Sequence, residues 1–105
     1  MRSMSTCPDY DVVENAPHSR YEARVQEGQQ DAGRVIGVLK YERQDGVVVM
    51  PSTVTDPQFR GNGIASALTQ RALDDARRTG ARVRPDCWYV EGWIDRHPDY
   101  AQLRA

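Results

Sequence analysis

The chain has 105 residues, of which 28% are charged and 39% are hydrophobic, and its formal net charge at pH 7 is -1. This length suits one domain with its own hydrophobic core, which needs no metal or disulfide scaffold. The near-neutral charge argues against a nucleic-acid-binding or polybasic membrane-binding protein, because such proteins depend on clustered positive charge.

The N-terminal part of the chain mixes Ser, Pro, Asp and Asn with only a short apolar patch, Val12-Val13. Residues 1–18 are therefore predicted to form a poorly ordered tail, and residues 19–105 a single domain. Residues 1–10 lack the apolar core of a signal peptide, and no apolar run is long enough to span a bilayer. No association with a membrane is expected.

The first half of the domain has the pattern of an antiparallel meander. Residues 21–25 alternate apolar and polar side chains, as a half-buried strand does. A second apolar stretch over residues 33–42 is followed by the turn signal Gln44-Asp45-Gly46 and a third apolar run over residues 47–50. Pro51 comes next, and because proline cannot donate to a strand ladder, we expect a β-bulge or a failure of strand pairing there.

The second half of the domain has a helical pattern on both sides of a short strand. Apolar residues at helical spacing predict a helix over about residues 64–79, ended by Gly80. Residues 81–87 are predicted to form a strand parallel to the one before the helix, because a crossover helix joins the two. Residues 88–96 are predicted to form a second, shorter helix. The fold class is α+β.

The loop before the first helix is the strongest candidate for a binding site. It contains Arg60-Gly61-Asn62-Gly63-Ile64-Ala65-Ser66, in which glycines stand where the helix begins. Backbone N–H groups and the positive end of a helix dipole bind anions such as a pyrophosphate, and glycine lets the backbone approach the ligand closely. The Gly-Lys-Ser/Thr ending of a P-loop is absent, and a dinucleotide-binding loop would follow the first strand. The alternative is a Gly-rich turn that only caps the helix.

Arg60-x-x-Gly63-x-Ala65 resembles the Q/R-x-x-G-x-G/A motif with which the GNAT superfamily of N-acetyltransferases binds the pyrophosphate of acetyl-coenzyme A. The resemblance continues through Pro85-x-Cys87-x-x-Val90 and Ile94-x-x-His97-Pro98-x-Tyr100, covers about residues 13–103, and is greatest to the small single-domain YjdJ-like branch. It implies a minimal GNAT (acyl-CoA N-acyltransferase) fold, in which an antiparallel meander joins a parallel βαβ unit and two strands splay apart at the cofactor site. The implied cofactor is acetyl-CoA or coenzyme A.

The same resemblance implies a set of cofactor-binding residues. Backbone groups of the strand before the loop would contact the acyl-pantetheine, and the loop amides would hold the pyrophosphate. The set consists of Thr53, Val54, Arg60, Gly61, Asn62, Gly63, Ile64, Ala65 and Ser66. Four further arginines, at positions 77, 78, 82 and 84, either reach the ribose 3′-phosphate or form a solvated face.

Cys87 is the first candidate for catalysis. Acyl transfer needs a nucleophile, a base and a proton donor for the leaving group. Cys87 ends the strand beside the expected cleft and precedes the last helix, where the positive end of a helix dipole favours a thiolate. It could accept the acetyl group, and the alternative is a buried structural cysteine. His97, at the end of that helix, is expected to act as a C-cap.

Two positions depart from the pattern of catalytic residues that the resemblance implies. Ser52 stands where the branch often has a histidine, and Trp93 where the superfamily often has the tyrosine that protonates the leaving thiolate. Tyr89, one helical turn earlier than Trp93, is the candidate substitute. Trp88 and Tyr100 are expected to be core or ligand-wall aromatics.

Two functions of different classes stay open. The first is an N-acetyltransferase that moves an acetyl group from acetyl-CoA to an unidentified amine on a small molecule or protein, directly or through Cys87. The second is a non-catalytic CoA-binding or protein-interaction module. Cys7 and Cys87 form no CxxC or Cys/His array, so no metal site is expected and a reducing, cytoplasmic location fits. A monomer or weak dimer with no nucleic-acid partner is expected.

Overall fold

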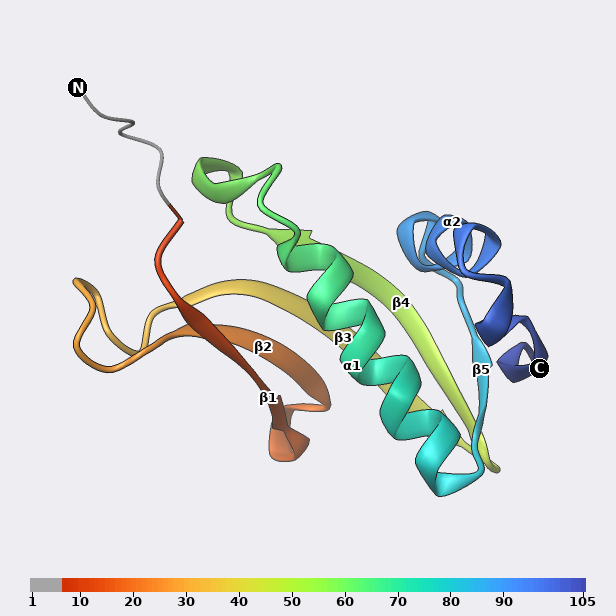
Figure 1. The fold of residues 1–105 in the computed structure, drawn as a ribbon. Helices are drawn as coiled ribbons and strands as arrows, with labels where there is room; N and C mark the ends of the chain where they lie inside the picture. Colours follow the sequence, from red (N-terminus) through yellow and green to blue (C-terminus); the bar gives the residue numbers. More distant parts are fainter. Residues whose placement is uncertain (1–6) are drawn as a thin grey trace.

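A computed structural model describes residues 7–105, and its centre is a mixed sheet in the strand order β1-β2-β3-β4-β5 (Figure 1). Neighbouring strands are antiparallel except for β4 and β5, which are parallel. This arrangement confirms the predicted α+β class, the meander and the parallel βαβ unit. The strands are β1 (Tyr10–Asn15), β2 (Arg20–Val25), β3 (Val35–Gln44), β4 (Val47–Thr55) and β5 (Arg82–Arg84).

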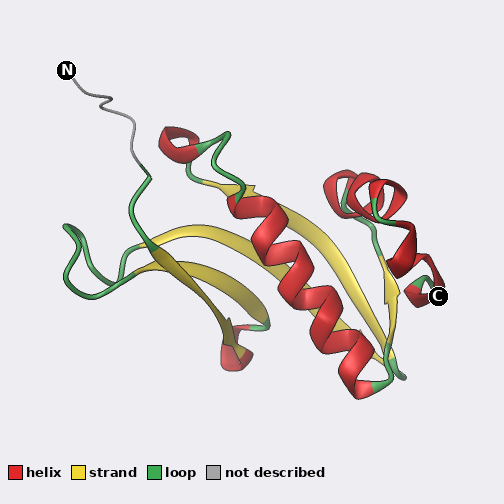
Figure 2. Ribbon diagram, in the orientation of Figure 1, coloured by secondary structure: helices red, strands yellow, loops and turns green. Residues whose placement is uncertain are grey.

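Helix α1 (Ile64–Thr79) lies across one face of the sheet, and α2 (Trp88–Arg96) lies beside β5 (Figure 2). Both helices have the bounds predicted from the sequence. Gly80 ends α1 in the left-handed conformation, with φ of 77°. The described residues also contain three short 3-10 helices: η1 (Ala16–His18), η2 (Pro57–Phe59) and η3 (Pro98–Leu103). No helix within residues 7–105 is long and apolar enough to cross a membrane.

Strand β1 was not predicted, and the expectation of a poorly ordered tail is wrong for residues 10–18. β1 pairs with β2 along its whole length, from Tyr10 opposite Val25 to Asn15 opposite Arg20. None of its side chains is fully buried, so its sequence carries only a weak hydrophobic signal. The ladder and contacts from distant side chains hold it instead, since Arg71 of α1 donates to the Val12 carbonyl at 2.8 Å. Residues 1–6 of the predicted tail lie outside the described residues.

The register between β3 and β4 shifts near Pro51, where the sequence predicted a β-bulge or a failure of strand pairing. Lys40 lies opposite Ser52 and Glu42 lies opposite Val49, so Met50 and Pro51 together oppose Tyr41. This two-against-one arrangement is a β-bulge. On its other side, β4 pairs with β5 only over Val47–Val49, and the two strands then diverge. The predicted splay therefore begins at the bulge.

The start of α1 is held close to the sheet by a glycine in β3. A Cβ at Gly37 would lie 2.6 Å from Ile64 Cγ2, closer than real Cβ atoms come to a neighbour, and 3.1 Å from Leu68 Cδ1, which is also tight. Because glycine removes this clash, the first turn of α1 packs directly on β3 beside the diverging part of β4. The core beneath α1 includes Leu39 and Met50, both fully buried. The position of the loop before α1 follows from this packing.

Candidate functional site

A cleft of about 670 Å³ opens where β4 and β5 diverge, between the start of α1 and the start of α2. It brings together ten of the eleven predicted site residues, which come from three separate parts of the chain. Its lining consists of Thr53, Val54, Thr55, Phe59, Arg60, Gly61, Gly63, Ile64, Ala65, Ser66, Cys87, Trp88 and Tyr89.

One part of the cleft is a group of backbone amides at the start of α1. Gly61 and Gly63 have φ of 86° and 78°, and no atom lies within 4 Å of the place where a Cβ would stand at either position. Gly63 is the N-cap residue and provides no side-chain cap, and the first backbone bond of the helix runs from Ala67 N–H to the Gly63 carbonyl. The N–H groups of the first turn are therefore free to meet an anion, together with the helix dipole.

The side chains around these amides have different roles. Arg60 lines the cleft, and its guanidinium makes no hydrogen bond or ion pair with any residue in the range 7–105. Asn62 is the predicted residue that the cleft does not include, because its side chain donates to the Phe59 carbonyl at 2.9 Å and tightens the loop. The Ser66 hydroxyl accepts a hydrogen bond from Trp93 Nε1 at 2.9 Å. Ser66 thus links α1 to α2 as well as lining the cleft.

Cys87 lies at the inner end of the cleft, where it is 7% exposed. Its N–H donates to the Met50 carbonyl at 2.9 Å, so its backbone is anchored at the bulge. Its Sγ donates to Thr53 Oγ1 at 3.7 Å, across the gap between the diverging strands. Cys87 is also the N-cap residue of α2 and does not cap the helix with its side chain. The thiol therefore faces the cleft near the positive end of a helix dipole.

Tyr89 lines the same cleft, whereas the other candidates for proton transfer do not. Trp93 is 2% exposed and stacks on His97, with ring centroids 3.7 Å apart. His97 Nδ1 is 2.7 Å from the Trp93 carbonyl oxygen, and its backbone ends α2. The expectation of a structural C-cap is thereby met. Tyr100 donates to Asp74 at 2.8 Å and packs on Trp93, outside the cleft.

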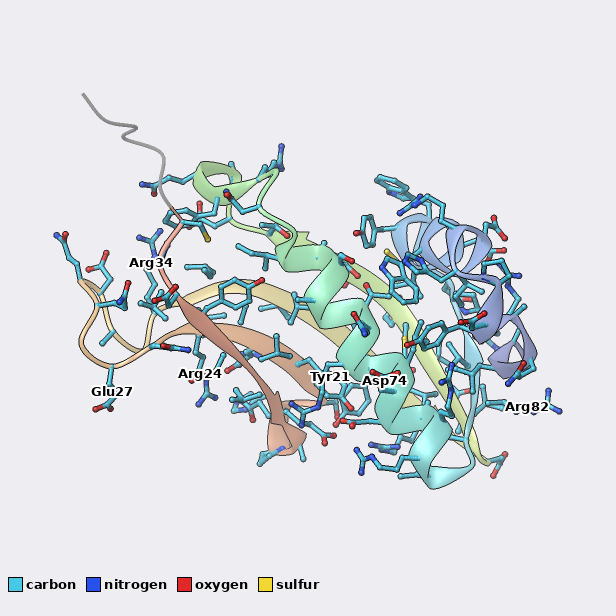
Figure 3. All side chains as sticks on the ribbon, viewed as in Figure 1. Tyr21, Arg24, Glu27, Arg34, Asp74 and Arg82 are labelled. Carbon is cyan, nitrogen blue, oxygen red and sulfur yellow. The ribbon has the colours of Figure 1, made fainter. Side chains whose placement is uncertain are left out.

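None of the four clustered arginines lines the cleft. Arg82, for example, donates to the Arg104 carbonyl near the C-terminus and lies far from the start of α1 (Figure 3). Arg77 lies over the Tyr100 ring, 4.2 Å from its centroid, and Arg84 pairs with Asp86 at 3.2 Å. Arg78 pairs with Asp75. These contacts favour the predicted solvated face over contact with a bound cofactor.

Sequence reasoning missed two residues of the cleft, Thr55 and Phe59. Thr55 carries a recognisable signal, because it lies two residues beyond Thr53 on a strand and therefore shares its face. Phe59 carries none, since a single aromatic residue in a loop can point to either side. Trp88 was predicted as a core or ligand-wall aromatic, and it lies in the wall of the cleft with 84% of its surface exposed. No group of three or more His, Cys, Asp or Glu within residues 7–105 could hold a metal ion.

Comparisons with known proteins agree with this architecture. Residues 20–103 match the family model of the GCN5-related N-acetyl-transferases. An NMR structure of a GCN5-like protein from Staphylococcus aureus superimposes with a TM-score of 0.67 at 11% identity, covering 90% of this chain and 87% of that one. The ribosomal-protein-S18-alanine N-acetyltransferase from Escherichia coli superimposes with a TM-score of 0.51 at 12% identity. That alignment covers 75% of this chain but 43% of the other. A comparison with curated protein sequences finds no match.

Proposed function

Because the chain belongs to the GCN5-related N-acetyltransferase family, we propose that it binds acetyl-coenzyme A in the cleft and transfers the acetyl group to an amine. The observation that carries the proposal is the group of uncapped amides at the start of α1, in the same cleft as the buried Cys87 thiol. Acetyl-CoA carries a diphosphate and a thioester, separated by a flexible arm. The amides at the start of α1 suit the diphosphate, and the inner end of the cleft suits the thioester.

The residues present fit this cofactor. The open space above Gly61 and Gly63 leaves room for a diphosphate against the amides of residues 60–66, and Arg60 adds a free positive charge. Asn62 would take part through its backbone N–H alone, because its side chain is turned into the loop. Beyond the bulge, β4 has no partner on its β5 side within the described chain, so backbone groups of Thr53 and Val54 are available to the amides of the pantetheine arm.

Two ionisable side chains other than Arg60 line the cleft, and we propose both as catalytic groups. When bound, acetyl-CoA supplies an activated acyl group and a thiolate leaving group. Cys87 Sγ is the atom on which the acetyl group would be held, with Thr53 Oγ1 accepting the thiol hydrogen bond that orients it. Tyr89 is proposed to supply the proton for the leaving group from its phenol, and the proton that Cys87 Sγ loses on forming its bond to the acetyl carbon would return to the Tyr89 oxygen. Direct attack by the amine is the alternative route, which does not require Cys87.

Mass spectrometry of the protein incubated with acetyl-CoA tests the route. We expect one acetyl group on Cys87 that disappears when an acceptor amine is added. The matched control is Cys7→Ser, which removes the other cysteine and should leave the adduct intact. Turnover of amines without any adduct on Cys87 would establish direct transfer. Absence of any acetyl-CoA binding by calorimetry would overturn the whole proposal.

One observation favours the second candidate function, a non-catalytic CoA-binding module. No His, Asp or Glu lines the cleft within the described part of the chain, so no side chain of the usual base types stands beside an incoming amine. Release of the CoA thiol in the presence of a panel of amines separates the two functions. Turnover that falls in Tyr89→Phe supports the enzyme, whereas tight binding without turnover for every amine supports the module.

A further inference from the structure

Trp88 presents a large apolar surface to solvent at the edge of the cleft. Its side chain is 84% exposed, whereas Trp93, the other tryptophan, is 2% exposed. Trp88 therefore contributes little to the hydrophobic core, although its ring is among the largest that the chain has. Val54, in the β4 wall of the same cleft, is also exposed, at 62%. Apolar surface of this kind beside a cavity is typical of a ligand-binding wall.

The positions of the groups in the cleft indicate which part of a ligand would meet Trp88. Cys87, which is 7% exposed, lies at the inner end against Thr53. The free amides lie at the start of α1, and the exposed Trp88 lies at the mouth. A ligand with its thioester at the inner end and its diphosphate on the amides extends out of the cleft beyond the diphosphate. In coenzyme A that outer part is an adenosine 3′-phosphate, which ends in a flat aromatic base.

We infer that the Trp88 indole stacks on the adenine of the bound cofactor and so forms the wall of a nucleotide subsite. This inference rests on the proposed function. Stacking on an aromatic side chain binds a nucleobase strongly and does not depend on which base it is, because every base has a π-face. The Tyr89 ring lies 6.1 Å from the Trp88 ring at 74°, and this edge-to-face contact limits the rotation of the indole. Arg60 also lines the cleft, and its charge suits the phosphates that flank the adenosine.

The test combines truncation of the side chain with truncation of the ligand. Binding of coenzyme A and of 4′-phosphopantetheine, which lacks the nucleotide, is measured by calorimetry for the wild type, Trp88→Ala and Trp88→Phe. We expect Trp88→Ala to weaken coenzyme A binding about tenfold and to leave 4′-phosphopantetheine binding unchanged. Trp88→Phe should retain most of the affinity, because phenylalanine keeps an aromatic face. All three proteins should fold, since the ring is outside the core.

Tryptophan fluorescence gives a second measurement on the same proteins. The fluorescence of Trp88 is the difference between the emission of the wild type and that of Trp88→Phe. Coenzyme A should quench this fluorescence, and 4′-phosphopantetheine should not. An equal loss of affinity for both ligands in Trp88→Ala would overturn the inference, because the indole would then contact the arm. Unchanged coenzyme A binding with a raised KM for the amine would also overturn it, and would assign Trp88 to the acceptor. In both cases the proposed function stands. If the wild-type protein does not bind coenzyme A at all, both the inference about Trp88 and the proposed function are overturned.

Discussion

The two ends of the sheet differ in whether their polar groups are paired within the protein. At the β1–β2 end, buried polar groups are paired within the protein: Glu22 is 1% exposed and accepts hydrogen bonds from Asn15, Arg20 and Arg24 at 3.0, 2.6 and 2.7 Å. At the β4–β5 end, the strands separate and the amides at the start of α1 have no side-chain cap. The first arrangement stabilises the fold, and the second leaves donors for a ligand.

The same contrast applies to the aromatic residues. Tyr21 is buried, with its hydroxyl donating to Asp75 at 2.8 Å, and Tyr41 donates to Glu14 at 2.5 Å. In the cleft, by comparison, Trp88 is exposed and its ring meets that of Tyr89 in a T-shaped contact. A residue type therefore does not reveal its role in this protein. The two regions differ in whether other residues of the protein surround the aromatic side chain or leave it exposed to solvent.

The largest effect is expected for the thiol at the inner end of the cleft. Cys87→Ser should reduce turnover about a thousandfold, equivalent to about 4 kcal/mol, because the hydroxyl is a far weaker nucleophile than a thiolate. Steady-state release of coenzyme A measures the effect. Cys7→Ser is the matched control and should have wild-type turnover. If Cys87→Ser also has wild-type turnover, Cys87 is a structural residue.

The next largest effect is expected for a glycine at the amide cluster. Gly63→Ala should weaken coenzyme A binding about a hundredfold, or about 2.7 kcal/mol, because a Cβ obstructs several charge-assisted hydrogen bonds to the diphosphate. Gly33→Ala is the matched control: Gly33 has a φ of 86° and similarly open surroundings but lies in the β2–β3 loop. Both variants should lose comparable stability, and calorimetry should show weaker binding only for Gly63→Ala. Equal affinities would exclude the amides as the diphosphate site.

A smaller effect, on stability alone, is expected at the paired end of the sheet. Glu22→Gln should lower the free energy of unfolding by about 2 kcal/mol, because it removes the charge that Arg20 and Arg24 surround while both arginines stay partly solvated. Chemical denaturation measures this loss, and coenzyme A affinity should not change. Glu27→Gln, on the exposed β2–β3 loop (Figure 3), is the control and should be neutral. A neutral Glu22→Gln would show that the cluster does not stabilise the sheet.

The same carboxylate predicts a pH dependence of stability. Burial opposes the ionisation of Glu22, but hydrogen bonds from Arg20, Arg24 and Asn15 outweigh it and lower its pKa from 4.5 to about 2. Because the pKa in the folded state is depressed, its contribution is fully present above pH 4.5 and is lost as the pH falls toward 2. Denaturation midpoints between these limits should fall more steeply in the wild type than in Glu22→Gln. Parallel curves would contradict the assignment.

The smallest effect is expected where the two helices meet beside the cleft. Trp93→Phe removes the Nε1 donor that bonds Ser66 Oγ at 2.9 Å and should cost about 1 kcal/mol of stability beyond the change in packing. A double-mutant cycle with Ser66→Ala isolates this hydrogen bond, and additive losses would show that it contributes nothing. Such a result would place the link between α1 and α2 in the apolar core alone.

Sequence patterns were sufficient for most of the fold and for most of the residues that line the cleft, Thr55 and Phe59 being the two that were missed. The helices begin and end at the predicted residues, because apolar periodicity and a C-terminal glycine act within a few residues of one another. The bulge at Pro51 follows from the missing N–H of proline. Strand β1 could not be predicted, because its half-buried side chains gain their contacts from β2 and α1, which come later in the chain.

The sequence by itself therefore determined the order of the strands and α-helices from β2 onward, the loop that opens α1 and the family. Only the tertiary structure decided which side chains of the site face the cleft: Asn62 turns into its own loop, Ser66 accepts from Trp93, and Trp88 stays in solvent. It also decided that arginines of the cluster are engaged by other groups of the protein outside the cleft. The physical reason is that local patterns report a residue's neighbours within one or two turns, whereas exposure and hydrogen-bond partners depend on segments that are distant in the chain.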